Sequence, residues 1–373
     1  MVKETVVFAL TSSTDLAAAV CKDLGLPLGK IKVEHFADGE ILVEPQESVR
    51  GRSVFIIQST CTPVTEHLME VLVCIDACKR ASAGTINVIM PYYGYARQDR
   101  KAKPRQPITS KLVANLLVTA GANRVMTFDL HAAQIQGYFD IPIDDLTAVP
   151  MLGKYFKEKN FPAGEVVVVS PDHGGVVRAR RLADVLDAPI AIIDKRRPKP
   201  NMVEAQNVIG DVDGKICIVV DDIVDTAGTL CAGCKILKDH GAKDVYVGVT
   251  HAIFSRDAVD KIENSVIREM VVSNTIPFPA EKAERSTKIT VLSIDAMVAK
   301  AIDAIQNHTP VSEVYNDFGF DMKSRYRRSL RSFMKRAIFI KAIMMDCTAR
   351  SVKHSIPSLR LPKKANAQSA AAN

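Results

Sequence analysis

One stretch of the chain, residues 216–229, restricts the possible folds more than any other. It reads Ile-Cys-Ile-Val-Val-Asp-Asp-Ile-Val-Asp-Thr-Ala-Gly-Thr. Its first five residues are apolar, mostly β-branched, and few enough to form a buried parallel strand. Helix-forming residues follow from Leu230 until Gly241, so a strand, a short turn and a helix are predicted here. Open α/β sheets bind their ligands at this end of a strand.

The polar residues of this stretch suit a sugar phosphate. Gly228 is expected to let the backbone curl, so that N–H groups and the Thr226 and Thr229 hydroxyls converge on one anion at the positive end of the helix. Asp221 and Asp222 would then face sugar hydroxyls or a divalent cation. An acidic surface turn is the alternative, but adjacent carboxylates at the end of a buried strand repel each other and are poorly hydrated without a partner. The stretch therefore predicts a ribose-phosphate site.

The chain repeats itself. Residues 51–59 align with residues 214–222, 163 positions further on, and each segment is followed by a helix, a small-residue turn and another β-rich segment. Duplication of one domain is the simplest explanation. Gln58 and Ser59 replace the two acids in the first copy, so we expect one ribose-phosphate site per chain, in the second domain.

Strand, helix and turn signals alternate up to about residue 316, which indicates α/β layers with mainly parallel sheets. We predict two tandem domains, residues 1–146 and 147–316, each a mainly parallel sheet flanked by helices. The last helical segment of the second domain is expected to be able to pack on the first. Residues 317–373 are predicted to be an atypical basic tail, partly helical or disordered.

Composition and charge narrow the class of protein. The chain has 373 residues, enough for two domains with full cores. No apolar stretch approaches the roughly 20 residues needed to span a bilayer, and the first residues predict a strand, not a signal peptide. Eight cysteines are scattered with no secretory signal ahead of them, so they are interpreted as reduced thiols of a cytoplasmic enzyme.

The positive charge of the chain belongs to its tail. Residues 317–373 hold 13 Lys or Arg and 3 Asp, a net charge of +10, whereas residues 1–316 carry a net charge of −3. The apolar spacing in residues 324–346 predicts a basic amphipathic helix. Several roles stay open for the tail. It is either a dispensable appendage or a basic helix that lies on an anionic membrane, binds nucleic acid or packs on a neighbouring subunit.

Residues 216–229 resemble the signature of the phosphoribosyltransferase superfamily, and the rest of the chain is similar to the ribose-phosphate pyrophosphokinase family. The segments that carry this likeness are Phe36-Ala-Asp-Gly-Glu40, Gln58-Ser-Thr-Cys61, Tyr95-Ala-Arg-Gln-Asp-Arg100, Asp129-Leu-His-Ala132 with Gln134-Ile-Gln136, Ser170-Pro-Asp172 with Gly174-Gly175, and Asp194-Lys-Arg-Arg197. They follow the family's order and spacing over about residues 3–316. The resemblance implies two phosphoribosyltransferase-like domains and leaves the tail without a counterpart.

The resemblance also implies how ATP is held. The adenine would lie against Phe36, with Asp38 and Glu40 accepting from its amino group, while Arg97 and Gln98 come from a neighbouring subunit. An aromatic ring and a guanidinium plane can sandwich a base, and carboxylates suit an exocyclic amine. From the residues alone, a core position for Phe36 beside a hairpin turn is the alternative. A shared site implies a homo-oligomer, which we expect to be a hexamer.

The remaining roles follow from the same likeness. His131 and Asp172 match the positions that hold the magnesium of the ATP phosphates, so Mg²⁺ is the expected cofactor. Lys195 and Arg197 match the catalytic positions of a mobile loop. The predicted contacts to ribose 5-phosphate are Asp221, Asp222, Asp225, Thr226, Ala227, Gly228 and Thr229. His173 departs from the small or aliphatic residue expected there, and Pro310 stands where a serine of a phosphate-activated site is expected.

The predicted activity is transfer of the β,γ-diphosphoryl group of ATP to ribose 5-phosphate, which gives phosphoribosyl pyrophosphate and AMP. One alternative is a phosphoribosyltransferase that consumes this product, but the segments around Phe36, Arg97 and His131 would then be idle. The other is a non-catalytic subunit that regulates an active synthase. Such a protein should carry an interrupted loop at residues 194–197, and this chain does not.

Overall fold

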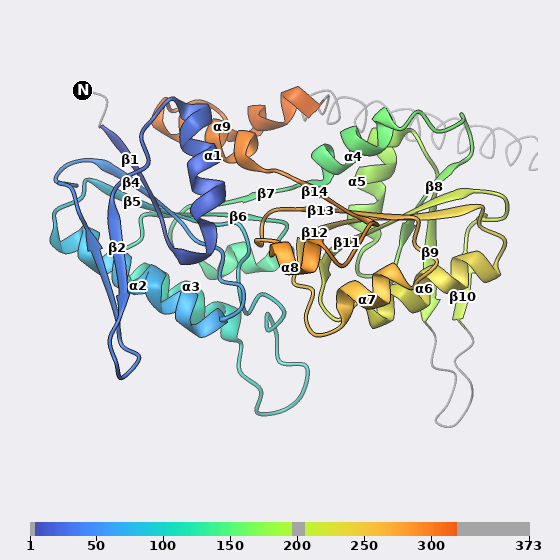
Figure 1. Cartoon of the computed structure of the whole chain (residues 1–373), viewed down its shortest axis with the longest axis horizontal. Helices are drawn as coiled ribbons and strands as arrows, with labels where there is room; N and C mark the ends of the chain where they lie inside the picture. Colours follow the sequence, from blue (N-terminus) through green and yellow to red (C-terminus); the bar gives the residue numbers. More distant parts are fainter. Residues whose placement is uncertain (1–3, 196–205, 319–373) are drawn as a thin grey trace, which may run out of the picture. The chain divides into compact units, whose positions relative to one another are not determined.

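The protein contains two sheets and one separate hairpin (Figure 1). The computed structural model describes residues 4–195 and 206–318. Residues 319–373 of the predicted tail and the predicted loop residue Arg197 lie outside these residues. Within the described part of the chain, no helix combines the length and apolar character required to cross a bilayer.

The first sheet has five parallel strands in the order β1-β4-β5-β6-β7. The strands are β1 (Thr5–Ala9), β4 (Ser53–Ile57), β5 (Thr85–Met90), β6 (Arg124–Phe128) and β7 (Ile143–Leu146). Its connections are η1 (Thr11–Ser13), α1 (Thr14–Leu24), α2 (Val64–Arg80), α3 (Thr109–Ala120) and η2 (Ala133–Tyr138). All five residues of β4 are buried, as expected for a parallel strand covered on both faces. An antiparallel hairpin, β2 (Ile31–His35) and β3 (Ile41–Pro45), stands between β1 and β4 in the sequence.

The second sheet has seven strands in the order β10-β9-β8-β11-β12-β13-β14, parallel except for the pair β9 and β10. They are β8 (Val166–Ser170), β9 (Ile190–Lys195), β10 (Gln206–Ile209), β11 (Ile216–Val224), β12 (Asp244–Ala252), β13 (Glu269–Ser273) and β14 (Ile289–Leu292). The helices around it are α4 (Val149–Glu158), α5 (Val176–Leu186), α6 (Gly228–Asp239), α7 (Ala258–Glu263) and α8 (Ala280–Ala283). β11 lies at the centre of the sheet, which places its end among the other strand ends.

The strand order repeats, as the sequence repeat predicts. The order β1-β4-β5-β6-β7 in the first sheet corresponds to β8-β11-β12-β13-β14 in the second. In both halves an antiparallel hairpin interrupts the chain after the first of these strands, β2–β3 in one and β9–β10 in the other. The Phe36 turn and the loop after Lys195 are therefore equivalent positions of the duplicated unit.

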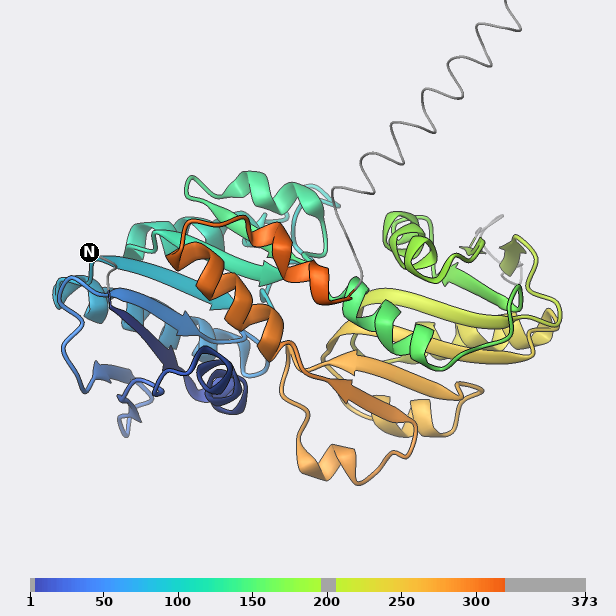
Figure 2. The same ribbon diagram turned by 90° about the horizontal axis from the view of Figure 1, so that it is seen from above.

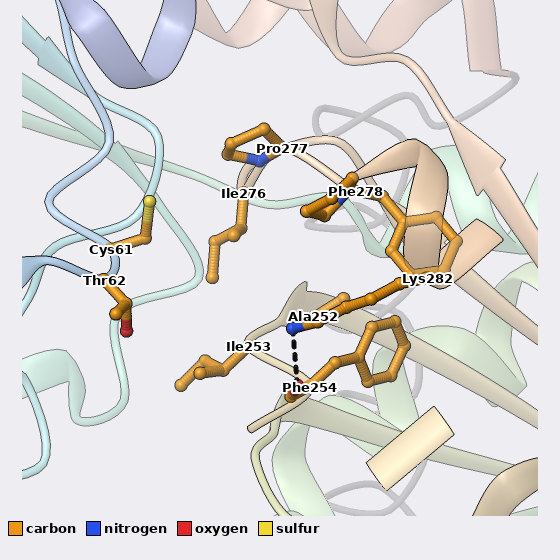
Figure 3. A pocket seen from close by; sticks show the side chains of 10 residues that line it. Cys61, Thr62, Ala252, Ile253, Phe254, Ile276, Pro277, Phe278 and Lys282 are labelled. Atoms are coloured by element: carbon orange, nitrogen blue, oxygen red, sulfur yellow. Dashed lines mark hydrogen bonds between the residues drawn. The ribbon is translucent and has the colours of Figure 1, made fainter. Parts of the chain in front are cut away.

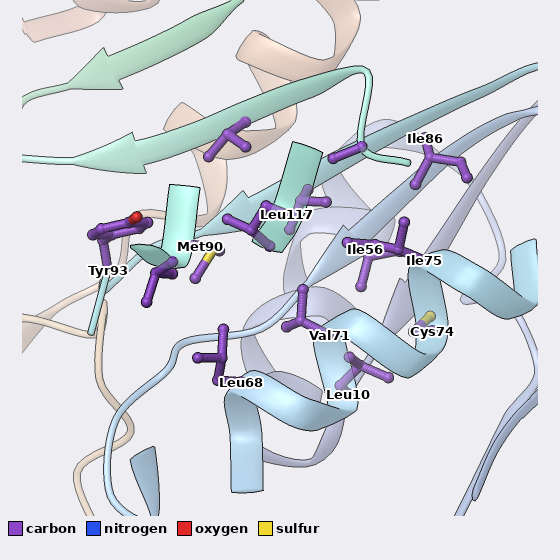
Figure 4. Close-up of a cluster of buried hydrophobic side chains, with 14 of the residues drawn as sticks. Leu10, Ile56, Leu68, Val71, Cys74, Ile75, Ile86, Met90, Tyr93 and Leu117 are labelled. Carbon is purple, nitrogen blue, oxygen red and sulfur yellow. The ribbon is translucent and has the colours of Figure 1, made fainter. Parts of the chain in front are cut away.

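Separate apolar cores hold the helices on the sheets. On one face of the first sheet, α2 and α3 bury Val71, Ile75 and Leu117 against strand residues such as Ile56 (Figure 4). The second sheet has a corresponding core on each face, one of them formed with α4 and α5. We call each sheet with its covering helices a lobe: the first sheet with α1–α3 is the first lobe, and the second sheet with α4–α8 is the second lobe.

The chain returns to the first lobe after β14. Helix α9 (Asp295–Gln306) packs on α1 and on the other face of the first sheet (Figures 1 and 2). Its buried Met297, Val298 and Ile302 share a core with Val20 of α1. The short helix η3 (Val311–Phe318) continues this core. In the sequence, the second lobe thus lies between two segments that pack together in the first lobe.

Candidate active site

The two predicted acids at the end of β11 lie side by side and share one cation. Arg178 of α5 places Nη1 3.2 Å from Asp221 Oδ1 and 3.2 Å from Asp222 Oδ1. The backbone N–H of Asp222 also donates to Asp221 Oδ1, at 2.9 Å. One guanidinium therefore faces two carboxylates in a partly dehydrated site, which leaves negative charge uncompensated.

The first lobe contributes a second partner to this pair. His131, which follows β6 by three residues, donates from Nδ1 to Asp222 Oδ2 at 2.7 Å. The hydrogen bond with Asp222 raises the pKa of His131. Burial by itself would raise the pKa of Asp222, but the His131 hydrogen bond and the Arg178 charge outweigh it and hold that pKa below its usual range. Burial and the neighbouring Asp222 carboxylate raise the pKa of Asp221 to about 7.

The predicted turn between β11 and α6 is present, but its left-handed residue is not the one expected. Ala227 has a left-handed backbone with φ of +59°, whereas Gly228 begins α6. The prediction that Gly228 provides the conformational freedom is therefore wrong. A Cβ atom at Gly228 would meet no atom within 4 Å, so its missing side chain leaves open space at the N-terminus of the helix. Anions bind at such positions because the first N–H groups of a helix lack internal partners.

A second contact joins the lobes at this turn. Arg97 follows β5 in the first lobe, and its Nη1 lies 2.9 Å from Asp225 Oδ2 in the same chain. The neighbouring Gln98 accepts from the Thr109 hydroxyl through Oε1, at 2.5 Å. Both side chains are exposed. Arg97 therefore stands beside the phosphate turn of its own chain.

The other residues predicted to bind ATP lie on the tip of the β2–β3 hairpin. The backbone N–H of Phe36 donates to the Glu40 carbonyl at 2.8 Å, and that of Glu40 to Asp38 Oδ1 at 3.1 Å. Phe36 keeps 51% of its surface exposed. It is thus not a core residue, and an exposed ring on the same turn as two acids is available to a planar ligand.

Asp172 lies in the loop between β8 and α5. Its Oδ1 accepts from the backbone N–H of Gly175 at 3.0 Å, and its carbonyl accepts from the Ser170 hydroxyl at 2.6 Å. His173 turns instead toward β9, with Nε2 3.2 Å from Asp194 Oδ1. The structure thus brings His131 to Asp222, while Asp172 forms hydrogen bonds with Ser170 and Gly175 of its own loop.

The backbone of Lys195 ends β9, in register with Gln206 of β10. β10 is the edge strand of the second sheet, and β9 lies between it and β8. Arg197 lies outside the described residues.

Sequence reasoning missed Arg178 as the partner of both acids. The available signal was its position in the first turn of the helix after Gly174-Gly175, directly beyond a strand end. It also missed Asp129, His251 and Thr250, which join the lobes behind the site. Their partners are more than 120 positions away in the sequence, so no local pattern points to them.

The segments that follow β5, β6 and β8 thus bring Arg97, His131 and Arg178 to the acids at and after the end of β11 in a duplicated α/β fold. Two family models match the chain: the N-terminal domain of ribose phosphate pyrophosphokinase over residues 5–121, and the phosphoribosyl synthetase-associated domain over residues 170–316. A ribose-phosphate pyrophosphokinase from Fusobacterium nucleatum is 57% identical over 310 residues, covering 83% of this chain and 98% of that protein. One from Bacillus caldolyticus is 56% identical over 309 residues, covering 83% and 97%.

The fold of a solved relative agrees as well. The crystal structure of phosphoribosylpyrophosphate synthetase from Mycobacterium smegmatis superposes with a TM-score of 0.78 at 42% identity, covering 82% of this chain and 100% of that one. The chain belongs to the ribose-phosphate pyrophosphokinase family. The predicted family, the α/β fold with two mainly parallel sheets, and the enzyme class are confirmed.

Proposed function

We propose that the protein makes phosphoribosyl pyrophosphate and AMP from ribose 5-phosphate and ATP, the activity of its family. In this reaction the anomeric hydroxyl of ribose 5-phosphate attacks the β-phosphorus of ATP. The bond from that phosphorus to the α-phosphate oxygen breaks, AMP leaves, and the hydroxyl loses its proton. No covalent enzyme intermediate is needed, so the protein contributes position and charge.

The observation that carries this proposal is the pairing of His131 with Asp222 across the lobes. Residues assigned to the adenine of ATP lie on the first lobe, and residues assigned to ribose 5-phosphate lie on β11, at the start of α6 and in the turn between them, in the second. The hydrogen bond of His131 with Asp222 and the ion pair of Arg97 with Asp225 link the lobe that carries the first set to the lobe that carries the second. A phosphoribosyltransferase reaction would need only the second set.

Ribose 5-phosphate is assigned to the second lobe alone. The backbone N–H groups and hydroxyls from Asp225 to Thr229 would hold the 5-phosphate at the start of α6, which is 12 residues long. Asp221 and Asp222 would accept hydrogen bonds from ribose hydroxyls. The raised pKa of Asp221 supports this role, because a partly dehydrated carboxylate gains from hydroxyl donors.

The residues of the site also fit Mg²⁺, the expected cofactor. His131 donates from Nδ1 to a carboxylate, which leaves Nε2 as the nitrogen able to bind a metal, and this arrangement is common for metal-bound histidine. Asp172, with Asp221, adds the oxygen ligands that magnesium prefers. When bound, the ion would neutralise charge on the ATP phosphates.

Lys195 and Arg197 are assigned to the migrating diphosphoryl group. Two cations near the β-phosphorus would offset the negative charge that develops there. The place of Lys195 at the end of β9 supports this, because β9 lies next to β8, and Asp172 follows the end of β8.

We further propose a homo-oligomer, and specifically a hexamer, in which the β2–β3 hairpin of one subunit supplies Phe36, Asp38 and Glu40 to an ATP site completed by Arg97 and Gln98 of another. The exposure of Phe36 and the position of Arg97 beside the second lobe of its own chain support this division. The cytoplasmic location and the contact of the tail with an anionic surface stay predictions from the sequence.

The test is an assay of AMP release in the presence of MgATP, with and without ribose 5-phosphate. The proposed activity gives AMP release that requires ribose 5-phosphate and appears together with phosphoribosyl pyrophosphate. Consumption of phosphoribosyl pyrophosphate with a base would identify a phosphoribosyltransferase. Absence of both activities, with stimulation of an active synthase on mixing, would identify a regulatory subunit.

A further inference from the structure

Buried hydrogen bonds join the two lobes near the candidate active site. His251, at the end of β12, is almost fully buried and touches both lobes. Its Nε2 lies 3.0 Å from the carbonyl of Phe128 at the end of β6, and its Nδ1 lies 2.9 Å from the Thr275 hydroxyl. A carbonyl can only accept, so Nε2 carries a proton, while the Thr275 hydroxyl lies within reach of both His251 Nδ1 and, at 3.0 Å, the Thr250 carbonyl. The ring of Tyr92, in the first lobe, packs edge-on against the His251 ring, and the two ring centroids lie 5.1 Å apart.

The residue after Phe128 makes the second contact. Asp129 Oδ2 accepts from the Thr250 hydroxyl at 2.6 Å and from the Ala148 backbone N–H at 2.9 Å, while Oδ1 accepts from the Thr147 hydroxyl at 2.7 Å. Its backbone is left-handed, with φ of +36°. An Asp in this conformation is held there by its surroundings, and three hydrogen bonds to its carboxylate provide that restraint.

Apolar residues shield these contacts. Cys61, Tyr92 and Ile276 form a small buried cluster where the lobes meet. Next to it is a cavity of about 130 Å³, lined by Cys61 and Thr62 from the first lobe and by Ile253, Phe254 and Phe278 from the second (Figure 3). Thr250 and His251 are almost fully buried, so their hydrogen bonds are costly to break, because neither partner can turn to water.

Asp129 and His251, which join the lobes, both lie close to residues of the site. Asp129 precedes His131 by two positions, and His251 is the register partner of Ile223, the residue after Asp222. We infer that His251, together with the pair of Asp129 and Thr250, positions His131 of the first lobe against Asp222 of the second. His251 is a positioning residue, since its ring reaches Phe128 and Thr275 and touches neither acid of the site. This inference rests on the proposed function.

A positioning role for His251 predicts different effects on substrate binding and on the reaction rate, which a merely stabilising contact does not. All candidate contacts to ribose 5-phosphate lie on β11 and α6 of one lobe, so a loosened junction should leave binding of this substrate unchanged. The reaction with ATP needs groups from both lobes. A misplacement of about 1 Å between reacting groups can lower the rate on the order of 100-fold.

The experiment compares full-length wild type with His251→Phe, His251→Gln and Thr250→Val. Gln can keep the N–H that reaches the Phe128 carbonyl, whereas Phe loses both hydrogen bonds, and Val removes the hydroxyl that reaches Asp129 at nearly constant volume. Val245→Ala, at the far end of β12 and fully buried, is the control for general loss of stability. The measurements are kcat with MgATP, the Kd of ribose 5-phosphate by calorimetry, and Tm.

We expect His251→Phe and Thr250→Val to lower kcat by roughly 10- to 100-fold, with the Kd of ribose 5-phosphate within about twofold of wild type. His251→Gln should restore most of kcat. Unchanged kcat in both disruptive variants would overturn the inference, and so would an equal loss in Val245→Ala at a similar Tm or a parallel loss of ribose 5-phosphate binding. If His251→Phe does not fold, Thr250→Val decides. A wild type without activity would instead overturn the proposed function.

Discussion

The electrostatics of the site are set by one arginine shared between two adjacent acids. Arg178 lies 3.2 Å from both Asp221 and Asp222, and His131 completes the environment of Asp222 alone. The two carboxylates consequently differ: the pKa of Asp222 is lowered, while burial and its neighbour raise that of Asp221 to about 7. Because the pKa values of these adjacent acids shift in opposite directions, Asp222 stays negatively charged, whereas Asp221 readily binds a proton, a cation or a hydroxyl donor.

Replacing His131 tests its assignment to the ATP side of the site. His131→Ala should raise the MgATP requirement on the order of 10- to 100-fold, the range typical of lost metal-site contacts. Binding of ribose 5-phosphate should change little, because its contacts lie on the second lobe. Initial rates at varied Mg²⁺ and ATP, with calorimetry of ribose 5-phosphate, measure both. An unchanged magnesium dependence would remove His131 from the metal site.

Asp145 provides a prediction about stability and pH. Burial, followed by the charge of Asp129, raises its pKa to about 7, whereas an unfolded Asp titrates near 4. Between these values the folded state binds more protons, so the free energy of unfolding falls as pH rises through this window. Asp145→Asn removes this dependence and can still accept from the Leu130 N–H, as Asp145 Oδ1 does at 3.1 Å.

We therefore expect Asp145→Asn to raise the free energy of unfolding at pH 8 on the order of 2 kcal/mol, with the difference fading toward pH 4. Urea denaturation of both proteins across this range is the measurement. Asp144→Asn is the matched control, because it loses the ion pair with Arg124 and should gain no stability at pH 8. A difference for Asp145→Asn that is constant with pH would contradict the assignment.

At the scale of elements, the sequence predicts β11 and α6 well and their junction less well. The apolar run from Ile216 predicts the strand, but β11 continues through Asp221 and Asp222 to Val224, because β12 pairs with it along that length. Glycine patterns placed the turn's curl at Gly228, whereas the left-handed residue is Ala227. A non-glycine residue in this conformation is costly and is set by tertiary contacts that a local pattern does not contain.

The predicted catalytic loop is the segment of the sequence that connects β9 and β10. Replacing Lys195 or Arg197 with Ala should lower kcat on the order of 100-fold or more, because both are assigned to charge that develops in the transition state. KM for both substrates should stay nearly constant. Arg196→Ala removes the same charge from the same loop and serves as the control. Variants that change only KM would assign the loop to substrate binding.

At the scale of the molecule, the duplicated α/β architecture follows from patterns in the sequence, but the junction of the lobes does not. Alternating strand and helix signals and the 163-residue repeat are local or periodic, so they can be detected in one sequence. The contacts that make the site, His131 with Asp222 and Arg97 with Asp225, join residues 91 and 128 positions apart. They depend on how two finished lobes pack, which a single sequence does not reveal.

The basic tail gives the last prediction. Residues up to Phe318 belong to the fold: the Phe318 ring lies 5.9 Å from Lys154 Nζ, it packs on the core of α1 and α9, and Asp317 pairs with Lys300. Truncation after Phe318 should therefore preserve Tm and kcat, since every candidate site residue precedes it. Truncation after Asn316 removes these contacts and should lower the free energy of unfolding by about 1 kcal/mol.

Activity, oligomer size and sedimentation with anionic vesicles at low and high salt, for the full chain and both truncations, separate the roles of the tail. Salt-sensitive sedimentation that is lost in both truncations would make the tail an anchor to an anionic surface, since a net charge of +10 attracts such surfaces in a screened manner. Loss of activity together with a smaller oligomer after truncation at Phe318 would contradict dispensability and make the tail part of the assembly.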